Sequence, residues 1–102
     1  MNIRFFDSEL EKFIHSLDKQ TIAKVLRVID LLETFGYQLG LPHSKKVHEH
    51  LFELRIRGKQ EVRIFYVFHK NEAMLLHGFV KKSERIPKKE MDKALQRLMT
   101  LD

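Results

Sequence analysis

Three runs rich in β-branched and aromatic residues occupy the middle of the chain, at residues 51–57, 62–68 and 73–80. Two short polar breaks, at residues 58–61 and 69–72, separate these runs. Runs of this length between turn-forming segments are typical of antiparallel strands joined by hairpins. The pattern therefore predicts a three-stranded antiparallel meander over residues 51–82.

The alternation of side chains along a strand predicts which residues of the meander share a face. One side of the second run carries Val62, Ile64, Tyr66 and Phe68, and the other side carries Arg63, Phe65 and Val67. An isolated arginine among apolar neighbours is costly unless its charge meets water or a partner. Arg63 is therefore the first candidate for a functional residue.

Helical spacing appears before and after the meander. Apolar residues recur every three or four positions in two successive segments, Leu10–Leu17 and Ile22–Leu32, and again in Met91–Leu98. Asp7 or Ser8 is expected to open the first helix, and Gly36 is expected to end the second. Residues 2–6 are a short strand candidate, residues 37–50 are expected to form a loop, and Pro87 is placed in the first turn of the last helix.

These elements predict a single small α+β domain over residues 1–102, in the order β-α-α-β-β-β-α. The two helices before the meander are expected to form a helical hairpin on one face of the antiparallel sheet. The other face is expected to be open and basic.

Composition narrows the possible functions. The 102 residues contain no cysteine, which excludes disulfides, a thiolate nucleophile and a cysteine zinc site. No apolar run approaches the roughly 20 residues that span a bilayer, and the first residues lack the apolar core of a signal peptide. A cytoplasmic protein without a membrane partner is expected.

Charge is unevenly distributed along the chain. The formal net charge is +5, and residues 43–102 carry fourteen Lys or Arg against eight Asp or Glu. This asymmetry indicates a polyanionic partner, with nucleic acid first. On the isoelectric point alone, a charge that serves only solubility has equal weight as an explanation.

The motifs of phosphate-binding loops, zinc proteases and serine hydrolases are absent from the sequence. His48 and His50 lack a third ligand at a suitable spacing, so no metal or cofactor is expected. Cations are more informative, because neighbouring strands lie about 4.8 Å apart and bring their side chains together. The cations expected to converge on one face are Arg55, Arg57, Arg63, Lys81, Lys82 and Arg85.

Convergent guanidinium and ammonium groups suit a phosphate. The competing interpretation is an ordinary solvated sheet face with cross-strand pairs such as Glu53 with Arg63. That interpretation is favoured for Arg55 or Arg57 alone, and the phosphate site for Arg63 together with Lys81 and Lys82. Lys45 and Lys46 add positive charge before the meander, and Phe65 could offer a stacking surface for a base.

Several blocks together resemble a known family: Leu54-Arg55, Val62–Tyr66, Leu75–Lys82 and the helix after Pro87. They are similar to the RelE/ParE superfamily of type II toxin–antitoxin toxins, in particular its phage-derived, HigB-like branch. The resemblance implies an mRNA interferase, a metal-independent, cofactor-free endoribonuclease that cuts mRNA on the ribosome and so inhibits translation. Cleavage would use the 2′-OH of the RNA as nucleophile.

The resemblance also implies partners. A cognate antitoxin of helix-turn-helix type would inhibit the toxin, and operator DNA would be contacted only through the antitoxin complex. The antitoxin is expected to place an acidic segment against the basic sheet face or to displace the last helix.

Residue roles follow from the same resemblance. Arg63 matches the arginine that contacts the scissile phosphate, Arg55 matches a basic position on the preceding strand, and Lys82, or alternatively Lys81, matches the position that stabilises the leaving group. The RNA-binding residues implied around them are Lys45, Lys46, Arg57, Arg85 and Phe65.

Two departures from the family pattern leave proton transfer open. Glu53 stands where one type of relative has a lysine, and residues 86–102 contain neither tyrosine nor histidine. A lysine of depressed pKa or His77 is then the candidate for proton transfer.

Two alternatives to the nuclease remain. One is a ParE-like toxin that inhibits DNA gyrase without cutting RNA, because the same fold serves both activities. The other is an inactive relative that binds only its antitoxin or operator DNA. The cluster of Arg55, Arg63 and Lys82 favours the nuclease.

Overall fold

The computed structural model describes residues 1–101. Its elements are β1 (Asn2–Phe5), α1 (Ser8–His15), α2 (Lys19–Phe35), the short 3-10 helix η1 (Gly36–Gln38), β2 (Ser44–Lys46), β3 (Phe52–Ile56), β4 (Val62–His69), β5 (Glu72–Val80) and α3 (Lys88–Met99). Apart from η1 and β2, this order is the predicted one. Within residues 1–101, no helix is both long enough and apolar enough to cross a membrane.

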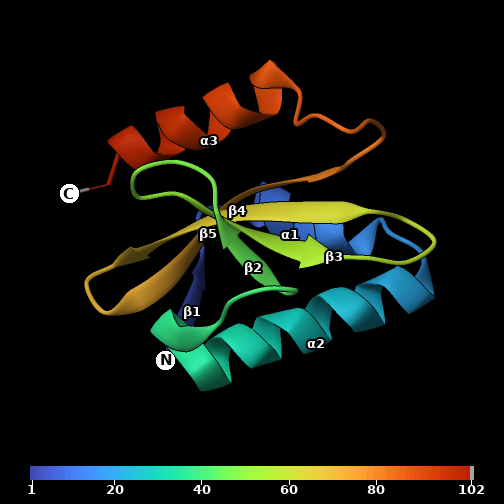
Figure 1. Cartoon of the computed structure of the whole chain (residues 1–102), viewed down its shortest axis with the longest axis horizontal. Helices are drawn as coiled ribbons and strands as arrows, with labels where there is room; N and C mark the ends of the chain where they lie inside the picture. The colour runs from blue at the N-terminus through green and yellow to red at the C-terminus, as the bar shows by residue number, and fades with distance from the viewer. Residues whose placement is uncertain (102) are drawn as a thin grey trace.

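The sheet has five strands in the order β1-β5-β4-β3-β2, and the predicted meander β3-β4-β5 forms its centre (Figure 1). The strands β3, β4 and β5 pair antiparallel, whereas β1 pairs parallel with β5. The prediction that residues 37–50 form only a loop is wrong, because Ser44–Lys46 pairs antiparallel with β3. Three residues are too few to show an alternating pattern. The strand is held by a buried hydrogen bond of 2.6 Å between the Ser44 and Tyr66 hydroxyls.

Two apolar cores lie on opposite faces of the sheet. The first core joins α1 and α2 to the face that carries Leu54, Ile64 and Tyr66. The second core joins α3 to the face that carries Phe65 and Phe79. Figure 1 shows α2 and α3 on opposite sides of the sheet, so α3 covers part of the face expected to be open. The basic residues described below occupy another part of that face.

Local sequence features set the ends of the helices. The side chain of Asp7, not that of Ser8, caps α1 by accepting a hydrogen bond of 3.1 Å from the Leu10 backbone N–H. Gly36 ends α2 with a φ of 53°, a conformation that glycine adopts without steric cost. Pro87 immediately precedes α3 as its N-cap residue.

A β-bulge interrupts the pairing of β4 with β5. Phe65 pairs with His77, but Tyr66 pairs with Leu75, so Leu76 is an extra residue on β5. Leu76 is fully buried in the α3 core, and His77 contacts Glu90 of α3. Two consecutive side chains of β5 therefore face α3.

Candidate nucleic-acid interface

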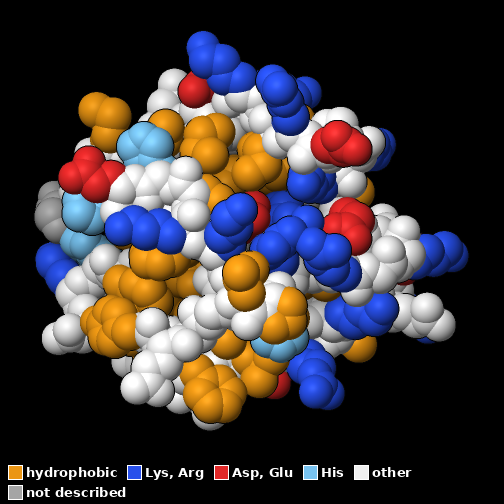
Figure 2. Space-filling view, in the orientation of Figure 1, with side chains coloured by type: hydrophobic (Ala, Val, Ile, Leu, Met, Phe, Trp, Pro, Cys, Tyr) orange, Lys and Arg blue, Asp and Glu red, His pale blue; other side chains and the backbone are white. Residues whose placement is uncertain are grey.

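An open hollow of about 450 Å³ lies on the α3 side of the sheet, where β3 and β5 end and β4 begins. We call it the basic groove; its lining residues are Arg55, Arg57, Glu61, Arg63, Lys81, Lys82, Ser83 and Glu84. Five cations therefore face two carboxylates. Figure 2 shows Lys and Arg side chains gathered in a dense patch, with acidic side chains at its margin. Such an excess of positive charge favours an anionic ligand.

Arg63 lies in the central strand and is the most buried charge of the groove, with 2 % of its surface exposed. Its Nη1 donates a hydrogen bond of 3.1 Å to the Val62 carbonyl and lies 3.1 Å from Glu61 Oε2. The strand alternation explains its position, because Arg63 shares a face with Phe65 and Val67. Paired in this way, Arg63 meets the expectation that its charge needs a partner.

Glu53 bridges two arginines beneath the groove. Arg55 and Arg63 stand directly opposite each other on β3 and β4, an arrangement that is destabilising for like charges. Glu53 is 5 % exposed; its Oε2 lies 3.6 Å from Arg55 Nε and its Oε1 lies 3.7 Å from Arg63 Nε. The cross-strand pair of Glu53 with Arg63, which is the alternative to a phosphate site, is therefore present. Its carboxylate compensates two guanidinium groups at once.

The contacts of Glu53 are ion pairs without good hydrogen-bond geometry. Within residues 1–101, Glu53 Oε1, Arg55 Nε and Arg63 Nε are buried without a hydrogen-bond partner. Buried polar atoms are usually satisfied, so this cluster of three calls for a functional explanation.

Lys81 and Lys82 follow the end of β5 and line the other side of the groove. The backbone N–H of Lys81 donates a hydrogen bond of 2.7 Å to the Glu61 carbonyl, which extends the pairing of β4 and β5 by one step. This bond places Lys81 beside Glu61, and Lys82 is exposed. The convergence predicted for Arg55, Arg57, Arg63, Lys81 and Lys82 is thus observed.

The remaining candidates lie elsewhere. Lys45 is paired with Glu53 across β2 and β3, so it lies on the basic face at the sheet edge. Lys46 lines a separate hollow with Phe52 and Phe68. Arg85 is exposed in the connection before α3. Phe65 is fully buried against Phe79, with ring centroids 5.6 Å apart, so its ring is not accessible to a base in this conformation.

His77 lies beneath α3 and does not line the basic groove. Its Nε2 is 2.8 Å from Glu90 Oε1, and its ring stacks on Phe79. Burial lowers the pKa of His77, and this effect outweighs the hydrogen bond and the charge of Glu90, which raise the pKa. His77 therefore tends to be neutral and links β5 to α3.

The donor set of the groove does not suit a metal ion, because guanidinium and ammonium groups repel cations. Among residues 1–101, no group of three or more His, Asp or Glu side chains is placed to hold a metal ion. His48 and His50 are exposed in the loop before β3. The chemistry of the groove is that of anion binding and charge stabilisation.

Glu61 is a part of the site that none of the sequence patterns singles out. Glu61 lies in the break before β4, two residues before Arg63, and this spacing places both side chains on the same face of an extended chain. The spacing is the signal in the sequence that points to the pair. The polar composition of residues 58–61 hides this signal, because it predicts a turn, in which side chains do not alternate.

Comparison with known proteins identifies the family. The sequence profile of the phage-derived protein Gp49-like family matches residues 12–99, which is most of the chain. None of the curated proteins matches the chain by sequence.

Two solved structures share the fold. A mutant of the E. coli toxin RelE in the free state superposes with a TM-score of 0.65 at 14 % identity, over 95 % of this chain and 96 % of RelE. The heterotetrameric YoeB–YefM toxin–antitoxin complex from Staphylococcus aureus contains a chain that matches with a TM-score of 0.54 at 20 % identity, over 74 % of this chain and 90 % of that one. These matches confirm the expected RelE-like fold and agree with the resemblance of the sequence blocks. The chain belongs to the phage-derived Gp49-like family, and its fold is that of RelE.

Proposed function

We propose that this chain is the toxin of a type II toxin–antitoxin system and that it cleaves mRNA on the ribosome as a metal-independent endoribonuclease. One observation carries the proposal: Arg63 reaches from the central strand into a groove that four further cations line. The fold shared with RelE and YoeB, both named as toxins, supports it.

The groove supplies the charge stabilisation that RNA cleavage needs. In this cleavage the 2′-oxygen loses its proton and bonds to the adjacent phosphorus, while the bond from phosphorus to the 5′-oxygen of the next nucleotide breaks. The departing oxygen takes up a proton, so the products are a 2′,3′-cyclic phosphate and a 5′-OH. The pentavalent intermediate carries extra negative charge, which Arg63 and Arg55 would stabilise from the floor of the groove. Lys82, or Lys81, would stabilise the departing oxygen from the groove's other side.

Glu53 gives the groove its preorganisation. A carboxylate between Arg55 and Arg63 holds two like charges side by side before the substrate arrives, so little reorganisation is needed during the reaction. Orientation of the 2′-OH in line with the leaving oxygen would add a second contribution. His77 has no direct part in proton transfer in this proposal, because it lies under α3 and outside the groove.

The partners in this proposal are the ribosome, its mRNA and a cognate antitoxin, and the site of action is the cytoplasm. The YoeB relative is found in a complex with its antitoxin. The basic groove would bind the phosphates of the RNA, and its positive charge would also attract an acidic inhibitor.

One observation favours a second candidate, an inactive relative that only binds its antitoxin or operator DNA. Glu53 and Glu61 both pair with Arg63 and cover it to 2 % exposure. If substrate does not displace Glu61, the arginine cannot reach a phosphate.

Translation of a defined mRNA in vitro with the purified chain, followed by primer extension, tests the proposal. We expect cuts in phase with codons that vanish with Arg63→Ala and persist with Arg4→Ala, an exposed arginine outside the groove. Circular dichroism of both variants controls for folding. Intact message with inhibited supercoiling would support a gyrase inhibitor, and intact message with normal supercoiling would support the inactive relative.

A further inference from the structure

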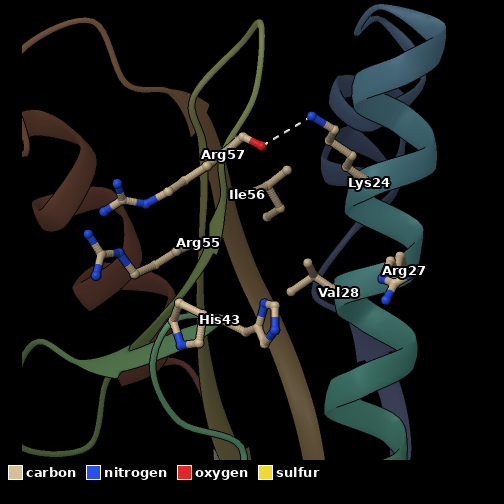
Figure 3. A pocket seen from close by; sticks show the side chains of 8 residues that line it. Lys24, Arg27, Val28, His43, Arg55, Ile56 and Arg57 are labelled. Carbon is tan, nitrogen blue, oxygen red and sulfur yellow. Dashed lines mark hydrogen bonds between the residues drawn. The ribbon is translucent and has the colours of Figure 1, made fainter.

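A second hollow, of about 320 Å³, lies between α2 and the edge of β3 (Figure 3). We call it the α2–β3 groove; its lining residues are Lys24, Arg27, Val28, Pro42, His43, Arg55, Ile56 and Arg57. Val28 and Ile56 are buried and form an apolar floor. Leu41, which precedes Pro42, is 68 % exposed and extends the apolar surface next to it.

The rim of the α2–β3 groove is cationic. None of its eight lining residues is acidic. Within residues 1–101, Arg27 makes no side-chain ion pair, and Lys24 makes one weak contact, a hydrogen bond of 3.4 Å to the Arg57 carbonyl. These cations are therefore available to carboxylates of a partner.

Within residues 1–101, the edge of β3 beside this groove has no backbone partner past Arg55. The register of β2 with β3 extends from Phe52 to Leu54, and one more hydrogen bond joins Arg55 N–H to the His43 carbonyl. Beyond Arg55, the carbonyl of Arg57 faces Lys24. An unpaired strand edge next to an apolar floor is a suitable seat for an extended peptide.

We propose that the α2–β3 groove binds a segment of the antitoxin that carries acidic side chains and at least one apolar anchor. The inference rests on the proposed toxin function. Charge complementarity selects the acidic side chains, and the apolar floor selects a peptide over a nucleic-acid backbone, which has no apolar group to place there.

This groove is coupled to the basic groove, because Arg55 and Arg57 line both. In Figure 3, the side chains of Arg55 and Arg57 leave β3 on the side away from α2. A carboxylate bound at the α2–β3 groove would attract the exposed Arg57 toward α2. The basic groove would lose one cation, so the antitoxin would weaken RNA binding without covering Arg63.

The test uses the full chain and the purified antitoxin encoded by the neighbouring gene. The double variant Lys24→Glu/Arg27→Glu is expected to bind this antitoxin at least about tenfold more weakly in calorimetry at 0.15 M salt. The matched control Lys12→Glu/Lys89→Glu changes the net charge equally at two exposed residues outside both grooves and should bind as wild type. A photo-crosslinking side chain at position 27 should label an acidic segment of the antitoxin.

Cleavage measurements separate this inference from the proposed function. Without antitoxin, Lys24→Glu/Arg27→Glu should cleave mRNA within about twofold of wild type, and inhibition should need at least about tenfold more antitoxin. Unchanged antitoxin affinity, or an equal loss in the control, would overturn the inference while leaving the nuclease intact. An antitoxin that fails to bind the wild-type chain would overturn both.

Two further results would assign the groove to another occupant and so refute the proposal. Loss of antitoxin-free cleavage in a folded double variant would indicate that the groove contacts the ribosome or RNA. A wild-type dimer that the double variant converts to a monomer, measured by light scattering, would indicate a second copy of the chain.

Discussion

Removal of the charge on Glu61 is expected to strengthen RNA binding and thereby raise cleavage at low substrate. Glu61 Oε2 lies 3.1 Å from Arg63 Nη1. The Glu61 carboxylate therefore competes with an RNA phosphate for the Arg63 guanidinium group. The variant Glu61→Gln keeps the size of the side chain and its backbone hydrogen bond with Lys81. It therefore changes charge with little change of shape.

The magnitude follows from the distance and the solvent exposure. A phosphate that replaces Glu61 on Arg63 would lie about 5 Å from the displaced carboxylate, where repulsion is about 0.8 kcal/mol in water and about 3 kcal/mol at an effective dielectric constant of 20. The Glu61 side chain is 40 % exposed, so the lower part of this range applies. About 1 kcal/mol corresponds to roughly fivefold in KM. The lost ion pair joins a half-exposed carboxylate to a buried arginine that keeps Glu53 as a partner, so the cost in stability should be nearer to the roughly 1 kcal/mol of a surface pair than to the cost of breaking a buried one.

The assay is the rate of cleavage of a defined message in a reconstituted translation reaction, measured over a range of mRNA-loaded ribosomes. Glu61→Gln should lower KM by about fivefold with kcat almost unchanged, and more salt should reduce the difference. Glu84→Gln, which removes another groove carboxylate that has no described ion pair in residues 1–101, is the matched control and should have a smaller effect. A fall in kcat with Glu61→Gln would refute the reasoning, because it would make Glu61 a participant in the reaction instead of a competitor.

Three other predictions concern single side chains. Arg63→Lys keeps a charge near Glu53 but loses the guanidinium fork, so cleavage should fall about 100-fold in the same assay, and wild-type activity would contradict the assigned role. Gly78→Ala should lower the free energy of unfolding, measured in urea, by about 1–3 kcal/mol, because a Cβ there would lie 2.9 Å from Phe13 Cε2. Gly40→Ala, with open space around it, is the control. The pKa of His77 is lowered in the folded protein, so the free energy of unfolding should fall as the pH drops below the unfolded pKa of 6.5 toward the folded pKa. His77→Gln should lose less of this free energy between pH 7 and 5 than the wild type does.

The central meander could be predicted from the sequence because it depends on local information. The run lengths and the alternation at Arg63 fix the strand, the face and the neighbours of that residue. The convergence of Arg55, Arg63 and Lys81 then follows from the short distance between paired strands. These are contacts between segments that are close in the sequence, and simple turns connect them.

Other parts of the site depend on tertiary contacts that no periodic pattern encodes. The narrow apolar stripe of α3 does not say which surface it covers, so the burial of Phe65 beneath it could not be foreseen. The position of His77 depends on the same contact, because its partner Glu90 belongs to α3. The pairing of Glu61 with Arg63 requires the extended chain of β4 to continue back to Glu61, which its hydrogen bond with Lys81 achieves and the polar composition of residues 58–61 does not indicate.

The bulge at Leu76 determines how the chain tolerates insertions and deletions. The side chains of β5 alternate on either side of the bulge, and Leu76 is the extra residue, so its deletion would remove the bulge and leave every later side chain on its present face. A one-residue deletion at Gly78, past the bulge, would instead send every later side chain of the strand to the opposite face. Phe79 would then leave the α3 core, and Lys81 would leave the basic groove for the side of α1 and α2. The same deletion in the exposed connection at residues 83–85 would leave the strand unchanged. The alternation of β5 past the bulge is therefore a condition for the groove, and Leu76 is a position where the strand can lose a residue and keep that alternation.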